Sequence, residues 1–149
     1  MKKGCLLLAM MCWAFVVNAQ DVSSLCCEND YDAKRAADLK TALQTSGLTI
    51  ADLSLQTPKL TKVPEELNAL TDLKCLDLSF NRIATFSESF KELTNLVCLN
   101  LSGNHYLQNL PAFLNDMPNL KVIRLEDLKW SEAKKRETEK AFPGITFVW

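Results

Sequence analysis

The feature that most constrains the fold of this chain is an apolar pattern that recurs about every 23 residues. The pattern Leu-x-x-Leu-x-Leu begins at Leu73 and at Leu96, and related versions begin at Ile50 and Leu120, at intervals of 23, 23 and 24 residues. Further apolar positions follow in phase across the units: Leu60, Ile83, Leu107; Val63, Phe86, Leu110; Leu67, Phe90, Leu114; Leu70, Leu93, Met117. Such a period predicts stacked units that share one core, because a single unit cannot bury its own apolar face.

Each unit has two kinds of local pattern. The alternation at Leu99 and Leu101 predicts a short strand with its leucines directed inward. The later spacing of Leu110, Leu114 and Met117 predicts a helical turn with one buried face. Stacking such units places a parallel sheet on the concave side and the helical turns on the convex side.

The segments 73–81 (LKCLDLSFN) and 96–104 (LVCLNLSGN) resemble the leucine-rich-repeat family, whose unit reads L-x-x-L-x-L-x-x-N-x-L. The resemblance runs from Ile50 to about Leu128, with the unit length of the family's short typical class. It implies an α/β fold, a short solenoid, and most often a protein partner. Asn81 and Asn104 then form an asparagine ladder, because their amides can satisfy backbone groups at the bend after each strand. The first unit has Pro58 at this place and the fourth has Leu128.

The start of the chain has the pattern of a secretory signal peptide. Lys2 and Lys3 precede an apolar run from Cys5 to Val17, and the small residue Ala19 follows. The run is shorter than the roughly 20 residues that span a bilayer. We therefore expect cleavage after Ala19, no stable transmembrane anchor, and a secreted, periplasmic or cell-surface location.

Caps are expected at both ends of the repeats. Asp30 can cap an N-terminal helix from Tyr31 to Ser46, and Ser131 can cap a charged helix through about Ala141. A closing strand follows with alternating Ile145, Phe147 and Trp149. The chain thus divides into a signal peptide (1–19), an N-terminal segment with its cap helix (20–49), four repeats of which the last is partial (50–130), and a helix-plus-strand C-terminal cap (131–149).

Four cysteines remain after the expected cleavage: Cys26, Cys27, Cys75 and Cys98. Cys75 and Cys98 occupy the same place in adjacent units, where Cα atoms about 4.8 Å apart fall within the disulfide range of about 4.4–6.8 Å. Three interpretations stand: a Cys75–Cys98 disulfide, two free thiols, or bonds from this pair to Cys26 and Cys27. The first two are favoured. No metal site is predicted, since the paired C-x-x-C spacing of zinc sites is missing.

The residues expected on the concave face form four rows across the units. These are Asp52, Cys75, Cys98, Val122; Ser54, Asp77, Asn100, Arg124; Gln56, Ser79, Ser102, Glu126; and Thr57, Phe80, Gly103, Asp127. This face is predicted to be polar with few apolar positions.

Phe80, Arg124, His105 and Tyr106 are the main candidates for binding, because neither the core nor the repeat pattern demands them. Aromatic and arginine side chains on a polar face are typical of interface hot spots. For Phe80 we weigh equally a structural role, packed against Cys75, Gly103 or the Tyr106 loop. Asp77 and Asn100 could bind sugar hydroxyls beside Tyr106, although the repeat consensus also carries them.

Charge and motifs exclude several function classes. A net charge of −1 gives no clustered positive field for nucleic acid. His105 is the single histidine and no nucleophile stands beside it by motif, so we predict no enzyme, no catalytic residue and no cofactor.

We predict an exported, non-enzymatic recognition module that binds a protein through the concave face and adjoining loops. The alternatives are a carbohydrate or cell-surface-glycan binder and a self-associating envelope protein. Four strands give a face of only about 320 Å², whereas a stable complex buries about 800 Å² per partner. The strands alone are therefore too small a site.

Overall fold

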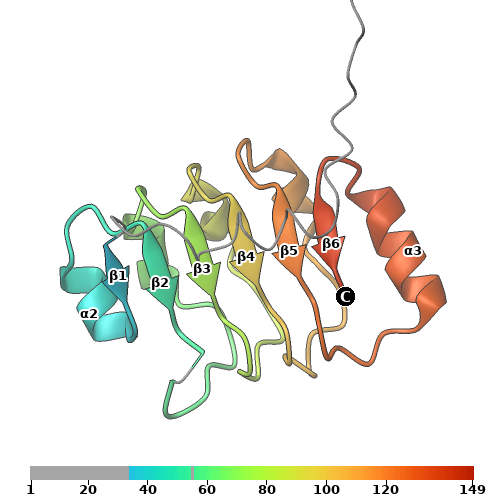
Figure 1. Cartoon of the computed structure of the whole chain (residues 1–149), viewed down its shortest axis with the longest axis horizontal. Coiled ribbons are helices and arrows are strands. Elements are labelled where there is room, and N and C mark those ends of the chain that lie inside the picture. The colour runs from blue at the N-terminus through green and yellow to red at the C-terminus, as the bar shows by residue number, and fades with distance from the viewer. Residues whose placement is uncertain (1–33, 55) are drawn as a thin grey trace, which may run out of the picture.

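The computed structural model describes residues 34–54 and 56–149, and in them it contains one parallel sheet of six strands. The strands follow one another across the sheet in chain order, so that each coil of the chain adds one strand (Figure 1). They are β1 (Arg35–Ala36), β2 (Ile50–Asp52), β3 (Cys75–Asp77), β4 (Cys98–Asn100), β5 (Val122–Arg124) and β6 (Thr146–Val148).

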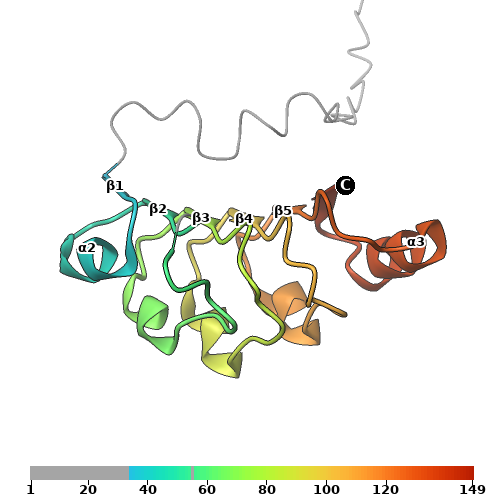
Figure 2. The ribbon, with the colours of Figure 1, turned by 90° about the horizontal axis from the view of Figure 1, so that it is seen from below.

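The helices of the described residues lie together on one side of this sheet (Figure 2). Three are short 3₁₀ turns in the convex part of successive coils, and two are α-helices at the ends. They are α2 (Leu39–Gln44), η1 (Glu65–Ala69), η2 (Glu88–Glu92), η3 (Ala112–Asp116) and α3 (Glu132–Ala141). The predicted fold, a short leucine-rich-repeat solenoid with a concave parallel sheet and convex helical turns, is confirmed.

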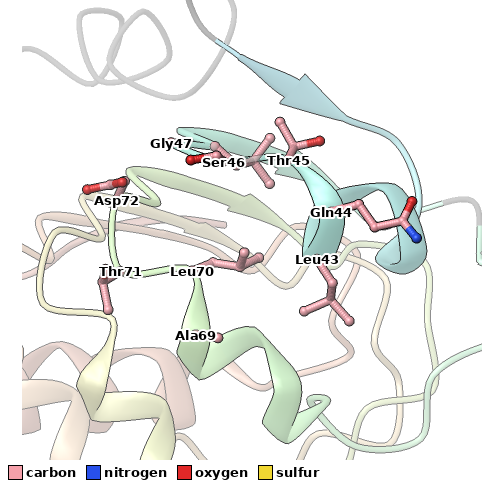
Figure 3. A pocket seen from close by; sticks show the side chains of 10 residues that line it. Leu43, Gln44, Thr45, Ser46, Gly47, Ala69, Leu70, Thr71 and Asp72 are labelled. Atoms are coloured by element: carbon pink, nitrogen blue, oxygen red, sulfur yellow. The ribbon is translucent and has the colours of Figure 1, made fainter.

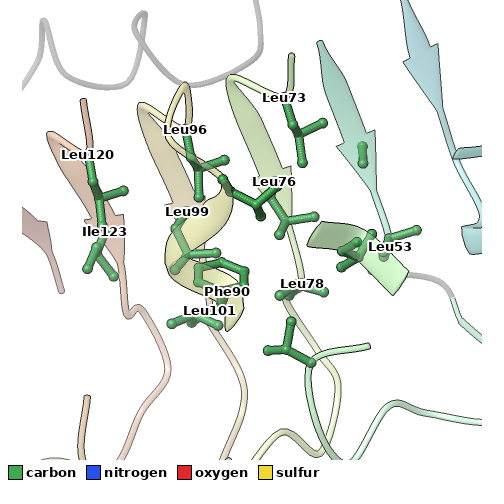
Figure 4. Close-up of a cluster of buried hydrophobic side chains, with 14 of the residues drawn as sticks. Leu53, Leu73, Leu76, Leu78, Phe90, Leu96, Leu99, Leu101, Leu120 and Ile123 are labelled. Atoms are coloured by element: carbon green, nitrogen blue, oxygen red, sulfur yellow. The ribbon is translucent and has the colours of Figure 1, made fainter. Parts of the chain in front are cut away.

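The core consists of columns of equivalent side chains from successive coils. Leu76 pairs in register with Leu99 and Leu99 with Ile123, and all three side chains have no exposed surface. Phe90, from a convex turn, packs in the same cluster, which Figure 4 shows between the strands and the turns. Complete burial of one such side chain contributes about 1.5–3 kcal/mol. The columns therefore hold the coils in register.

The first unit is offset from the alignment that the sequence suggested. Ile50 pairs with Cys75 and Ala51 with Leu76, an interval of 25 residues rather than 23. The cause is Ala51, a fully buried residue where later units have leucine, which hid the true pattern. The bridge between Lys62 and Thr85 restores the interval of 23. The two additional residues therefore lie in the loop between Asp52 and Lys62.

Asn81 and Asn104 connect neighbouring coils through buried amides. The Oδ1 atom of Asn104 accepts a hydrogen bond from the Ile83 amide (3.0 Å), and its Nδ2 donates to the Leu78 and Leu101 carbonyls (3.0 and 2.8 Å). Asn81 makes the same bonds one coil earlier, to Leu60, Leu53 and Leu78. With the corrected register, Gln56 rather than Pro58 takes this place in the first unit. It donates to the Ala37 carbonyl at 3.4 Å.

The N-terminal cap helix was predicted to run from Tyr31 to Ser46, and the predicted first residue is wrong. The chain forms β1 at Arg35–Ala36, and the helix α2 begins only at Leu39. Asp38, not Asp30, is the N-cap, and its carboxylate accepts hydrogen bonds from the Thr41 amide and hydroxyl (2.8 and 2.6 Å). The hydroxyl hydrogen bond is the main cause that lowers the pKa of Asp38. β1 forms because its backbone completes the ladder of β2.

The C-terminal cap has the predicted elements. Ser131 is the N-cap of α3 and accepts from the Lys134 amide (3.2 Å), and β6 pairs with β5. Aromatic rings fill the last interface: Phe147 stacks on Trp149 at a centroid distance of 5.4 Å, and the Trp130 indole donates to the Leu107 carbonyl (3.0 Å). Within the described residues, no helix has the length and apolar character needed to span a membrane. The predicted signal peptide lies outside these residues.

We expect Asn104→Ala to lower the free energy of unfolding by more than about 1 kcal/mol, because the buried Ile83 amide loses the Asn104 oxygen as its partner, at about 1–3 kcal/mol. Urea denaturation measures this change. Asn95→Ala is the matched control, since the exposed Asn95 amide makes one bond, to the Thr71 carbonyl. It should change stability by less than about 0.5 kcal/mol. Equal effects of the two substitutions would contradict the structural role of the ladder.

Candidate functional site

The first concave row is apolar and buried, unlike the polar face expected from the sequence. It consists of Ile50, Cys75, Cys98 and Val122, which are 5%, 6%, 1% and 2% exposed. Ile50 takes the place assigned to Asp52 because of the offset in the first unit. Cys98 is disulfide-bonded, so the interpretation with two free thiols is wrong. The predicted bond to Cys75 stays a prediction, beside a bond to Cys26 or Cys27, which lie outside the described residues.

The second row uses its polar atoms to close the bends after the strands. Asp77 accepts from the Ser79 amide (2.8 Å) and from the Asn100 side-chain amide (2.9 Å), while Asn100 accepts from the Ser102 amide (3.1 Å). Asp52 likewise accepts a hydrogen bond from the Ser54 amide (3.0 Å). These side chains fix the loops that follow them, which leaves few of their lone pairs for a ligand.

Arg124 lies in this row but binds within its own loop. Its guanidinium contacts Glu126 through Nε and Nη2, at 2.9 and 2.8 Å. A quarter of the Arg124 side chain is exposed. The ion pair with Glu126 occupies part of the guanidinium group of Arg124. A binding partner would therefore contact Arg124 and Glu126 together, as a neutralised pair, rather than an unpaired positive charge.

Phe80 is a large exposed side chain, with 58% of its surface open. Its backbone has a φ of 52°, and the equivalent Gly103 and Asp127 have φ values of 69° and 59°. This left-handed conformation is unusual for a bulky residue and clusters at functional sites. A Cβ atom at Gly103 would lie 2.7 Å from Cδ1 of Phe80, so the ring rests on the bare backbone of the next coil. Phe80 thus packs against Gly103 and still presents a wide apolar surface.

His105 and Tyr106 are both exposed in the loop after β4, and Tyr106 is 60% exposed. Tyr106 lines a shallow cleft of about 350 Å³ together with Thr61, Arg82 and Ala84. The loops that carry Phe80 and Tyr106 leave the carboxyl ends of parallel strands, which lie on one edge of the sheet. We call Phe80, His105 and Tyr106 the aromatic edge. Arg82 joins its surroundings and was not among the predicted residues.

A second cleft, of about 340 Å³, lies between α2 and the turn after η1 (Figure 3). Leu43 of α2 lines this cleft and is 42% exposed. The buried residue of α2 is Ala42, which packs in the core. Neither cleft brings together a metal-binding set, because the described residues contain no group of three His, Cys, Asp or Glu side chains placed to hold an ion.

Comparison with known proteins agrees with this architecture. Residues 49–105 match the model of the leucine rich repeat family. A solved structure of a leucine-rich-repeat protein from Leptospira interrogans is similar, with 27% identity and a TM-score of 0.59, over 68% of this chain and 25% of that chain. The chain therefore spans about a quarter of the length of that structure. No curated protein matches this chain.

Fold, repeat pattern and comparisons together support a leucine-rich-repeat protein. The fold is that of a protein-interaction module, and proteins of the family are typically non-enzymatic scaffolds for protein binding.

We expect Gly103→Ala to destabilise the fold by more than about 1 kcal/mol, because a positive φ and the contact with Phe80 both oppose a Cβ atom. Chemical denaturation measures the loss. Gly144→Ala is the matched control, since a Cβ there meets nothing within 4 Å, and its effect should stay below about 0.5 kcal/mol.

A double-mutant cycle with Phe80→Ala tests the contact itself. The second substitution removes the ring but not the backbone strain, so it should recover part of the loss caused by Gly103→Ala. Additivity within about 0.3–0.5 kcal/mol would show that the two residues do not interact.

Proposed function

We propose that this protein is an exported, non-enzymatic recognition module that binds a protein partner through the aromatic edge and the adjoining concave loops. Export is supported by Lys2, Lys3 and the short apolar run that ends before Ala19. Protein binding is supported by the leucine-rich-repeat fold. The absence of a catalytic motif in the sequence agrees with a binding role.

The observation that carries the proposal is the exposure of Phe80 in a fixed, left-handed backbone. Core packing does not explain an aromatic ring that is 58% exposed. A protein interface, by contrast, gains most from rigid aromatic side chains near its centre. Tyr106 adds a second large exposed aromatic ring on the same edge, with the Arg82 side chain beside it.

The dimensions of the solenoid support a site at this edge. The strand face alone is already too small for a stable protein interface. Because the first concave row is buried, the area of the strand face that a partner can contact is smaller still. The loops after β3 and β4 extend the surface beyond the strands. An interface centred on the aromatic edge can therefore include the concave loops and the cleft at Tyr106.

We expect Phe80→Ala combined with Tyr106→Ala to reduce partner affinity at least about 30-fold, the effect of losing about 2 kcal/mol at a hot spot. The melting temperature should change little, because both side chains are mostly exposed. Proteins retained from the native compartment by the immobilised mature chain are identified by mass spectrometry, and the affinity of the main one is then measured with each variant.

Leu43→Ala is the matched control, since Leu43 is the other large exposed apolar side chain of the described residues and lies on the N-terminal cap. It should leave the affinity unchanged. Unchanged affinity in the aromatic double variant would move the site to the convex side or to a cap. Capture of glycans alone, or a mass that rises with concentration in light scattering, would favour the two alternative functions.

A further inference from the structure

The loops that follow β2, β3 and β4 carry positive charge and no acidic residue. They span residues 53–62, 78–85 and 101–109, and their basic side chains are Lys59, Lys62, Arg82 and His105. The convex turns of the same coils, residues 64–70, 86–93 and 110–117, instead carry five acids and one base: Glu65, Glu66, Glu88, Glu92, Asp116 and Lys91. Since the whole chain has a net charge of −1, the positive charge is a local property of these loops. They form a surface that is complementary to an acidic partner.

Arg82 is the cation of these loops that is most open to a partner. Its side chain is exposed, and its guanidinium forms no ion pair or hydrogen bond within the described residues. The Lys59 ammonium, by contrast, donates to the Ser54 carbonyl at 2.8 Å, and the Lys62 ammonium lies 4.0 Å from a carboxylate oxygen of Glu65. Arg82 therefore presents an unpaired, planar set of N–H donors.

This guanidinium belongs to the cleft of about 350 Å³ at Tyr106, which three successive coils build. The lining residues are Thr61 from the coil of β2, Arg82 and Ala84 from the coil of β3, and Tyr106 from the coil of β4. Backbone hydrogen bonds join the first two coils here. The Arg82 amide donates to the Leu60 carbonyl (2.8 Å), and the Ala84 amide donates to the Thr61 carbonyl (3.1 Å). This part of the cleft is therefore fixed before a partner arrives.

The chemistry of the cleft favours a carboxylate with an apolar neighbour. A segment that covers the cleft removes the Arg82 guanidinium from water, and because a buried charge without a partner is costly, that segment must supply an acceptor. A carboxylate matches the guanidinium with two parallel hydrogen bonds. The hydroxyl groups of Thr61 and Tyr106 can donate further hydrogen bonds, while the Tyr106 ring and the Ala84 methyl group offer apolar contact.

We propose that the segment of the partner protein that contacts the aromatic edge is acidic. Arg82 binds a carboxylate of this segment in the cleft, and an adjacent apolar side chain of the segment packs on Tyr106. The inference rests on the proposed function, because it names the chemistry of the partner for the same surface. It gives the positive loops a role in attracting that partner, so association should be faster at low salt than at high salt.

Peptides selected from a random phage-displayed library on the immobilised protein provide a probe of known chemistry. We expect the selected peptides to carry Asp or Glu within two residues of an aromatic or aliphatic side chain. Their affinity should fall at least about tenfold for Arg82→Gln, because a hydrogen-bonded charge loses its partner. Arg136→Gln is the matched control, since Arg136 is also exposed but lies on α3, and it should leave the affinity unchanged.

A double-mutant cycle tests whether Arg82 and the carboxylate contact each other. Replacement of the acidic residue of the best peptide by its amide, Asn for Asp or Gln for Glu, should weaken binding to the wild-type protein at least about tenfold. The same replacement should change binding to Arg82→Gln less than about threefold, because the partner of the carboxylate is already missing. Equal losses with both proteins would show that the carboxylate binds elsewhere and would overturn the inference.

The remaining outcomes separate this inference from the proposed function. Selection of no peptide, selection of peptides without an acidic residue, or an affinity that Arg82→Gln leaves unchanged would each overturn the inference. The variant Phe80→Ala/Tyr106→Ala is measured beside Arg82→Gln with the partner from the native compartment. A loss of affinity in the aromatic variant alone would keep the aromatic edge as the site and overturn the acidic partner. No loss in either variant would overturn both.

Discussion

The structure depends on the burial of equivalent leucines in columns that no single coil can complete. Leu76 and Leu99 are wholly buried only because each lies between the coil before and the coil after it. The asparagine side chains add directional hydrogen bonds to this packing. Asn81 and Asn104 donate to carbonyls of the preceding coil as well as of their own coil. Apolar burial therefore holds the coils together, and the amides fix their register.

Most of the fold could be predicted from the sequence, because columns of equivalent residues leave a periodic pattern. The pattern located the strands β3 to β5 and the convex turns, and the capping residue Ser131 located the C-terminal helix. It misplaced the first unit, where Ala51 replaces a leucine and the loop is longer by two residues. It also misplaced the N-terminal helix, because pairing of β1 with β2 outweighs local helix propensity. Tertiary contacts of this kind produce no periodic pattern in the sequence.

The candidate site was less predictable, since surface side chains follow no repeat. Phe80 and Tyr106 could be found as aromatic departures from the repeat pattern, and both are exposed. Arg124 was equally conspicuous, but its pairing with Glu126 became visible only in three dimensions. The burial of the first concave row was not foreseen, because alternation along a strand shows which side chains share a face but not what covers that face.

The seating of Phe80 on Gly103 also bears on the thermodynamics of recognition. The left-handed backbone and the neighbouring glycine already restrict the ring in the unbound protein. A side chain that is ordered before contact has little rotational freedom left to lose when a second surface closes over it. Association at this ring would therefore carry a smaller entropic penalty than association at a freely rotating aromatic residue, and even a narrow solenoid could hold a partner with a small area of contact.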